Sequence, residues 1–223
     1  APMIDGGERL GRAWGIVGHL HAVNDIPPWR EAYNALLPDV TRFYSELGQN
    51  LALFAKFKAL RASPEYAALN ATQQRIVDND IRDFRLSGAE LAEADKPRFQ
   101  AIQEELAALG AKFSENLLDA TNAYGEYLED EALLAGIPDD VCRAAQEAAA
   151  LAGKAGWKFT LQAPSYGPVM QYADDRALRA RLYRAYATRA SELGQPEYDN
   201  SPLIDKLLQL RAEEAQLLGY ANY

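Results

Sequence analysis

The stretch that decides the fold is residues 95–121, DKPRFQAIQEELAALGAKFSENLLDAT. Apolar side chains recur in it every three or four residues, which places them on one face of an α-helix. They are Phe99, Ile102, Leu106, Leu109, Phe113 and Leu117. We therefore predict the longest helix of the chain from about Pro97 to Thr121. It should run unbroken through Gly110, because the flanking apolar stripe offsets the roughly 1 kcal/mol that glycine costs relative to alanine.

The same periodicity predicts several helices before this one. The first carries an apolar stripe made of Trp29, Tyr33, Leu36, Val40, Phe43 and Leu47. Pro38 lies inside that run and is expected to kink or divide the helix. A second segment follows the break at Gly48-Gln49-Asn50 and presents Leu51, Phe54, Phe57 and Leu60. Proline after Ser63 predicts another helix start, and Thr72 is expected to cap a helix whose apolar face is Val77, Ile81 and Phe84.

After Thr121 the pattern changes from helical to alternating. Residues 124–129 and 157–161 are short and aromatic-rich, and they predict two strands that pair, with Trp157, Phe159 and Leu161 on one side. Between them, Pro138 opens an alanine-rich helix and Gly153 closes it. The hairpin is expected to be a small insertion in an otherwise helical chain.

Three further segments complete the prediction. Residues 164–172 form a compact turn and helix, and Leu178, Leu182, Tyr186 and Leu193 mark a longer helix. Residues 194–200 form a polar loop, and the last helix is marked by Ile204, Leu208, Ala215 and Leu218. The predicted fold class is mainly α, with long antiparallel helices and a two-stranded β insertion, all in one unit over residues 1–223.

Charge and composition exclude several classes of function. The net charge is −9, and phosphate binding requires clustered Lys and Arg, so nucleic acid is not expected as a partner. Basic side chains such as Arg176, Arg179, Arg181 and Arg184 alternate with apolar positions and are interpreted as a solvated helix face. No apolar run reaches membrane-spanning length, so no membrane segment is expected. Cys142 is the only cysteine, which excludes a disulfide framework and fits a reducing cytoplasm.

The start of the chain shows no secretory signal, because Ala1-Pro2-Met3-Ile4-Asp5 has no basic segment followed by an apolar one. Ala1 is not an initiator residue. Two explanations remain open at this point: the sequence begins inside a longer gene product, or its start has been processed.

The two histidines do not form a recognisable metal site. His19 and His21 are two residues apart, so on a helix they point about 200° apart and cannot bind one ion as an i, i+4 pair does. Neither follows a glutamate at E-x-x-H spacing, which excludes a di-iron bundle. The adjacent acids, including Glu213-Glu214, do not face each other on a helix, and no phosphate-binding glycine loop is present. From the residues alone, we assign no catalytic, cofactor-binding or metal-binding position.

Several tracts nevertheless resemble a known family in their wording and order. They are residues 72–79 (TQQRIVDN), 82–88 (RDFRLSG), 112–121 (KFSENLLDAT), 164–172 (PSYGPVMQY), 182–191 (LYRAYATRAS), 210–213 (LRAE) and 217–223 (LLGYANY). Each tract is moderately specific, and together they resemble the oligopeptidase A and thimet-oligopeptidase family of zinc metallopeptidases. The resemblance extends from about Val17 to Tyr223.

The resemblance implies a function for the longer protein, but it assigns no functional role to any individual residue of this sequence. Members of that family bind zinc through H-E-x-x-H and a later glutamate, and no H-E-x-x-H occurs in this sequence. The resemblance implies that residues 1–223 are an N-terminal helical region that forms the wall of a channel. It also implies that Zn²⁺ and the catalytic domain belong to the rest of the parent protein. Short peptides in the cytoplasm are the substrates that it implies for that parent protein. The alternative is a stand-alone helical interaction module. Which residues would contact a peptide is left open.

Overall fold

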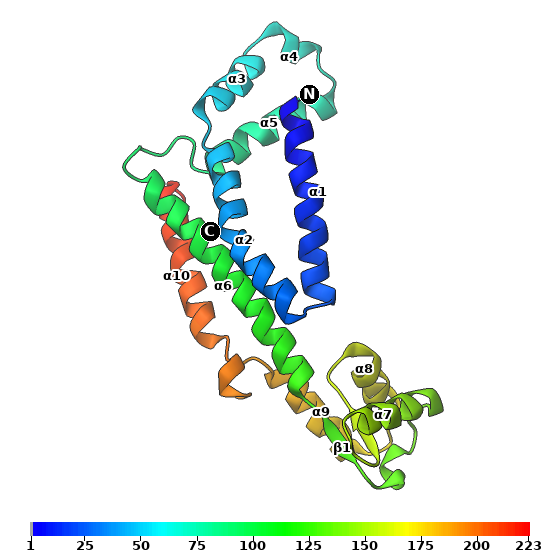
Figure 1. The fold of residues 1–223 in the computed structure, drawn as a ribbon. Coiled ribbons are helices and arrows are strands. Elements are labelled where there is room, and N and C mark those ends of the chain that lie inside the picture. Colours follow the sequence, from blue (N-terminus) through cyan, green and yellow to red (C-terminus); the bar gives the residue numbers. More distant parts are fainter. Residues whose placement is uncertain (1) are drawn as a thin grey trace. The chain divides into compact units, whose positions relative to one another are not determined.

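The computed structural model describes residues 2–223, which fold into helices and one small sheet (Figure 1). The α-helices are α1 (Pro2–Val23), α2 (Pro27–Gly48), α3 (Leu51–Arg61), α4 (Pro64–Ala68), α5 (Ala71–Leu86), α6 (Lys96–Ala123), α7 (Asp139–Leu151), α8 (Ala163–Tyr172), α9 (Arg176–Thr188) and α10 (Ser201–Leu217). The strands are β1 (Glu126–Leu128) and β2 (Trp157–Phe159), and two short 3₁₀ helices are η1 (Glu131–Leu134) and η2 (Pro196–Tyr198). The mainly α prediction is confirmed.

The chain divides into two compact units. Unit 1 consists of Ala1–Ala111 and Leu207–Tyr223, and unit 2 consists of Lys112–Lys206. The physical reason is that the region around the β insertion has enough apolar side chains to form a core of its own. Helices α6 and α10 each contribute residues to both units.

Unit 1 begins with α1 and α2, which run antiparallel to each other (Figure 1). Helix α1 was not predicted from the sequence, because its glycines weaken the helical signal. Helix α2 is continuous through Pro38, so the proline does not divide it. Its predicted stripe is only partly covered, since α2 has no buried residue and Leu36 and Phe43 are 50% and 42% exposed.

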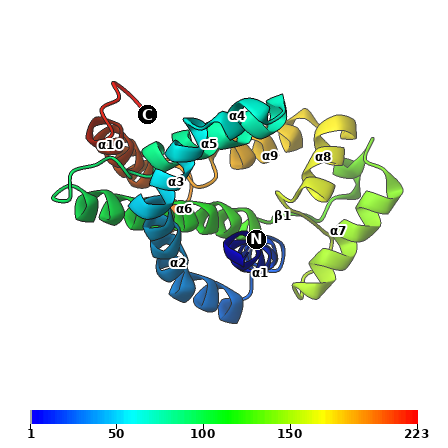
Figure 2. The same cartoon turned by 90° about the horizontal axis from the view of Figure 1, so that it is seen from above.

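Helices α3, α4 and α5 lie together in unit 1 and enclose its first core (Figure 2). That core contains Phe54, Val77, Ile81, Phe84 and Ala89, so the predicted face of α5 is confirmed. The predicted cap of α5 is wrong. Asn70, not Thr72, caps the helix: its side chain accepts the Gln73 N–H at 2.9 Å, and the Gln73 side chain accepts the Asn70 N–H at 3.1 Å. Thr72 lies inside the first turn.

The long helix is confirmed: α6 has 28 residues and is unbroken at Gly110. Its stripe is buried at the start, where Phe99 is 2% exposed and Ile102 fully buried, and is half-buried from Leu106 onward. Within unit 1, Arg98 of α6 forms an ion pair of 2.6 Å with Glu213 of α10.

The predicted last helix is confirmed as α10, although the residues that mark it in the sequence are only partly buried. Ala215 is buried, but the other buried position is Leu210, while Ile204 and Leu208 are exposed. The periodicity of α10 admits more than one apolar stripe, and the packing of the helix selects the one that contains Leu210. Leu218 follows the end of the helix.

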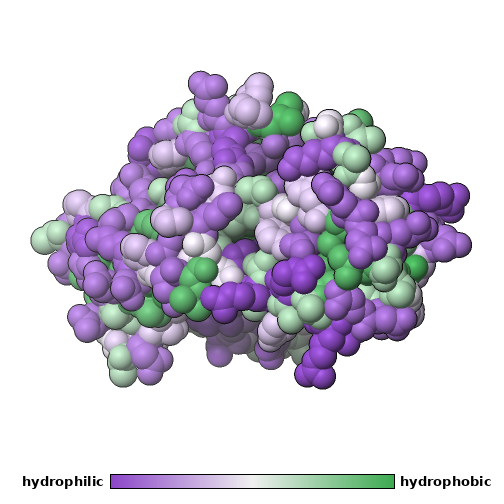
Figure 3. Space-filling model, turned by 90° about the horizontal axis from the view of Figure 1, so that it is seen from below, coloured by the Kyte–Doolittle hydropathy of each residue, from purple (hydrophilic) through white to green (hydrophobic). Residues whose placement is uncertain are grey.

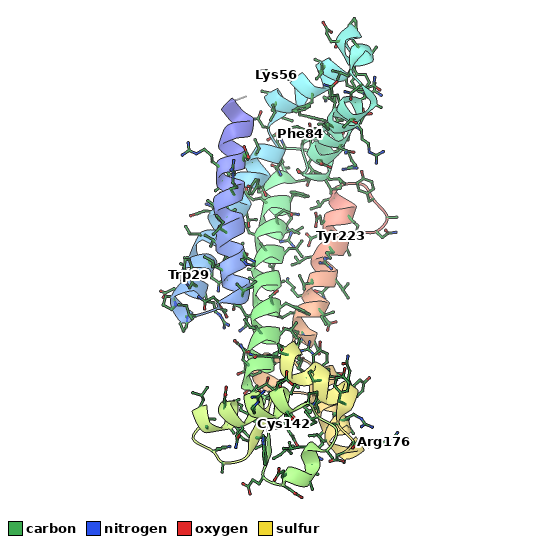
Figure 4. The ribbon with its side chains drawn as sticks, turned by 90° about the vertical axis from the view of Figure 1, so that its right-hand side faces the viewer. Trp29, Lys56, Phe84, Cys142, Arg176 and Tyr223 are labelled. Carbon is green, nitrogen blue, oxygen red and sulfur yellow. The ribbon has the colours of Figure 1, made fainter. Side chains whose placement is uncertain are left out.

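Unit 2 is built around the predicted hairpin, which is confirmed. Strands β1 and β2 are antiparallel, with Glu126 opposite Phe159 and Leu128 opposite Trp157. Helices α7 and α8 lie near this sheet (Figure 2), and Cys142 of α7 is labelled in Figure 4. The buried core consists of Leu128, Ile137, Ala145, Phe159, Leu161, Val169, Ala173, Leu178 and Leu182. The Cys142 thiol packs beside it, and burial raises its pKa.

Helix α9 is shorter than predicted, because it ends at Thr188 and Leu193 lies beyond it in an exposed turn. The solvated basic face is confirmed in part, since Arg176, Arg181 and Arg184 are exposed. Arg179 is half-buried and donates to the Ala173 carbonyl, so it holds the chain that precedes its own helix.

Hydrophilic residues cover most of the face seen in Figure 3, with hydrophobic residues scattered among them. None of the described helices combines the length and the apolar character needed to cross a membrane.

Candidate functional site

The two histidines lie on α1 and do not face each other. His19 is exposed, whereas His21 is half-buried against α2. The His21 ring stacks on Tyr33 with a centroid distance of 4.3 Å, and Tyr33 stacks on Trp14 at 4.8 Å. Tyr33 of α2 therefore stacks on two rings of α1, and these contacts join the two helices.

A buried carboxylate completes this group at the turn between the two helices. Asp25 has a side chain only 3% exposed, and its Oδ1 lies 3.8 Å from His21 Nε2. Arg30 donates from Nε to Asp25 Oδ2 at 2.9 Å. A guanidinium bound to the Asp25 carboxylate repels a metal cation, so the group fits a structural role in the α1–α2 hairpin better than a zinc site.

The described side chains form no recognisable metal centre. Among them, no three or more His, Cys, Asp or Glu residues are grouped so that they could hold an ion. No set of described residues therefore suits the zinc ion that the family resemblance implies for the parent protein.

A pocket of about 470 Å³ lies in unit 1 beside the last turn of α10. Its walls are formed by Arg82, Leu86, Glu214, Ala215, Leu218, Tyr220, Asn222 and Tyr223; Phe84 of α5 and Tyr223 are labelled in Figure 4. The Oε2 atom of Glu214 is buried, and no group of the described residues forms a hydrogen bond with it. Burial raises the pKa of this carboxyl, and Gln103 and Arg211 oppose the shift only in part. The site places a poorly solvated carboxyl group at an apolar wall.

An aromatic and cationic group lies in unit 2 where α8 meets α9. Tyr166 of α8 stacks on Tyr186 of α9 with a centroid distance of 4.2 Å. The Arg189 guanidinium lies over the Tyr186 ring at 3.6 Å, and Tyr183, one turn earlier on α9, is exposed. Hereafter we call Tyr166, Tyr183, Tyr186 and Arg189 the tyrosine–arginine cluster.

Sequence reasoning did not single out this cluster. The only signal available was the spacing of Tyr183, Tyr186 and Arg189, each three residues from the next, which brings successive side chains together on a helix. Tyr166 comes from another helix, so its position could not be read from that spacing.

Comparison with known proteins shows which proteins the chain is similar to. Residues 1–96 match the family described as Neurolysin/Thimet oligopeptidase, N-terminal domain, and residues 169–223 match Peptidase family M3. Over its whole length the chain is 42% identical to oligopeptidase A of Haemophilus influenzae and to oligopeptidase A of Escherichia coli. It is 32% identical, over 91% of its length, to a dipeptidyl carboxypeptidase of Salmonella typhimurium.

The chain belongs to the oligopeptidase A and thimet-oligopeptidase family. It corresponds to the N-terminal region of that family and covers 33% of each of the two oligopeptidase A sequences and 29% of the carboxypeptidase. The resemblance inferred from the sequence tracts is thus confirmed. The oligopeptidase A relationship includes both compact units, because the aligned region contains the entire chain.

Proposed function

We propose that this chain is the N-terminal, substrate-gating part of a zinc metallopeptidase that hydrolyses short unstructured peptides. The observation that carries the proposal is 42% identity to oligopeptidase A along the whole chain. In the proposed arrangement the helices wall a channel, and the metal ligands and the water-activating glutamate belong to the rest of the parent protein. A cytoplasmic location is part of the proposal, supported by a relative from Arabidopsis thaliana, 41% identical, named a probable cytosolic oligopeptidase A.

The physical argument for gating is the cost of unfolding. A short peptide without structure threads a narrow passage at little cost, whereas a folded domain must first lose roughly 5–15 kcal/mol of stability. A wall of rigid helices therefore selects substrates by size and structure before any side chain is recognised.

A stand-alone interaction module is the competing proposal. The exposed apolar side chains of α2, Leu36 and Phe43, favour it to the extent that such side chains suit a partner surface. The gene sequence after Tyr223 discriminates between the two: an H-E-x-x-H motif there supports the peptidase, and its absence favours the module.

The biochemical test compares this chain with the longer gene product. Both are dialysed, assayed for bound zinc, and incubated with a quenched fluorescent peptide in the presence and absence of a chelator. We expect chelator-sensitive hydrolysis by the longer protein only, and no one-to-one zinc in the 223-residue chain. Tight zinc binding or chelator-sensitive turnover by the short chain would contradict the proposed division of labour.

A further inference from the structure

Arg189 of the tyrosine–arginine cluster has one end of its guanidinium already engaged. Its Nη1 atom donates a hydrogen bond to the Tyr186 carbonyl in the last turn of α9. One planar face of the group lies over the Tyr186 ring at 3.6 Å, which is within cation–π distance. These contacts explain why the side chain turns back along its own helix, and they hold the guanidinium in one orientation.

The other edge of the same guanidinium has no acceptor in the described chain. Nε of Arg189 is buried and has no hydrogen-bond partner among the described residues, and the one hydrogen bond of the guanidinium to the chain is made by Nη1. A buried donor without an acceptor is unfavourable, so a structure that keeps one usually has a reason for it. The edge formed by Nε and Nη2 is the planar fork that binds the two oxygens of a carboxylate.

The surroundings suit an anion of this kind. No described carboxylate forms an ion pair with Arg189, although the chain carries 32 Asp and Glu residues. Tyr166 and Tyr186 stack beside the guanidinium, and the pKa of Tyr166 is raised by burial and by Tyr186 and Tyr183, while Arg189 lowers it. The three phenols and the cation are thus within electrostatic reach of one another, and each phenol supplies an O–H donor.

The backbone next to Arg189 is also unusual. Ala190 has a φ of +51° and is the only non-glycine residue with positive φ in the described chain. Its carbonyl accepts the Asn200 N–H at 3.2 Å, which ties the turn to the start of α10 within unit 2. Strained residues of this type concentrate at sites where a neighbouring side chain must be held in place.

We propose that the tyrosine–arginine cluster is a carboxylate-binding site, in which the Nε–Nη2 edge of Arg189 receives both oxygens and Tyr166 or Tyr183 donates a third hydrogen bond. The expected source is the terminal carboxylate of a peptide, and this choice rests on the proposed function. An acidic side chain from the rest of the parent protein offers the same chemistry, and the experiment separates the two sources.

The first arm measures binding to the 223-residue chain. The Nε–H resonance of Arg189, identified by its loss in Arg189→Lys, is followed by NMR while a short peptide is added with a free carboxyl terminus or as its amide. We expect saturable shifts with the carboxylate and binding weaker by at least about tenfold with the amide, because two charge-assisted hydrogen bonds are lost. Arg189→Lys keeps a cation but lacks the fork, so it should lose the preference.

Arg176→Lys serves as the control, and Tyr183→Phe tests the proposed third donor. Arg176→Lys alters an exposed arginine of the same helix and should leave the preference intact. Tyr183→Phe removes one exposed phenol and should weaken carboxylate binding without unfolding the unit, which circular dichroism checks. Equal affinity for the acid and the amide, or a preference that survives Arg189→Lys, would overturn the proposal.

The second arm repeats the titration with the longer gene product. Carboxylate binding in both proteins identifies the peptide terminus as the source, whereas binding by the short chain alone shows that a carboxylate of the parent occupies the site. Both results support the site. If the longer protein is a peptidase but neither protein prefers the carboxylate, the proposed site is wrong and the proposed function still holds. If the carboxylate is preferred but the longer protein has no peptidase activity, the site holds and the proposed function is wrong.

Discussion

At the residue scale, the cost of a core truncation should follow burial along one helix. Phe99 and Phe113 both belong to the predicted stripe of α6, but Phe99 is 2% exposed and Phe113 is half-buried. Phe99→Ala should therefore lower the free energy of unfolding by about 3–5 kcal/mol, and Phe113→Ala by clearly less. Urea denaturation of the two variants measures the difference. Equal losses would show that the stripe is buried along its full length.

The N-cap of α5 allows a second pair of variants to be compared. Asn70→Ala removes a side-chain acceptor of the capping box and should cost about 1 kcal/mol. Thr72→Ala is the control, because Thr72 lies inside the first turn and caps nothing. Thermal melts report both changes. A larger loss for Thr72→Ala would restore the cap that the sequence favoured.

The buried carboxyl group of Glu214 should make the folding stability of the protein depend on pH. Its pKa is raised in the folded state, so the folded protein holds this proton more tightly than the unfolded chain does, and stability falls as pH rises from the ordinary carboxyl pKa through the raised value. Glu214→Gln should therefore raise the melting temperature at pH 7. The gain should vanish at a pH below the ordinary carboxyl range, where both side chains are neutral. A gain that is independent of pH would assign the effect to packing.

At the element scale, the hairpin of unit 2 depends on a glycine before β2. Gly156 has φ +82°, and a Cβ added there would lie 2.1 Å from the Leu128 carbonyl oxygen. Gly153 also has positive φ, but a Cβ at that position meets nothing within 4 Å. Gly153→Ala should therefore cost about 1 kcal/mol of backbone strain, and Gly156→Ala substantially more. Denaturant midpoints of both variants decide whether the close approach to β1 matters.

The elements also show how far sequence reasoning reaches. Where apolar period and boundary residues agree, as in α6 and in α7 between Pro138 and Gly153, the prediction was confirmed. It failed where two neighbouring polar residues can both cap, as at Asn70 and Thr72, and it did not determine which apolar side chains of α10 are buried. The tyrosine–arginine cluster was out of reach, because Tyr166 approaches α9 only through tertiary packing.

At the scale of the whole molecule, the net charge of −9 predicts an effect of salt on the longer enzyme. If acidic side chains face the channel, basic peptides should be cleaved faster than acidic ones at low ionic strength. The preference should shrink at physiological salt, where exposed charges are screened over about 8 Å. Rates for the two peptides at low and high salt test this, and a preference that does not change with salt would remove the electrostatic contribution alone.

The proposed gating of peptidase substrates by these helices can be tested with a length series of one peptide sequence. The longer gene product is assayed for kcat/KM with unstructured peptides of increasing length and with a folded domain that contains the same cleavage sequence in a stable element. We expect efficient cleavage of the short peptides, a decline with length, and cleavage of the domain only after it is unfolded. Equal kcat/KM for the folded domain and the short peptide would contradict it.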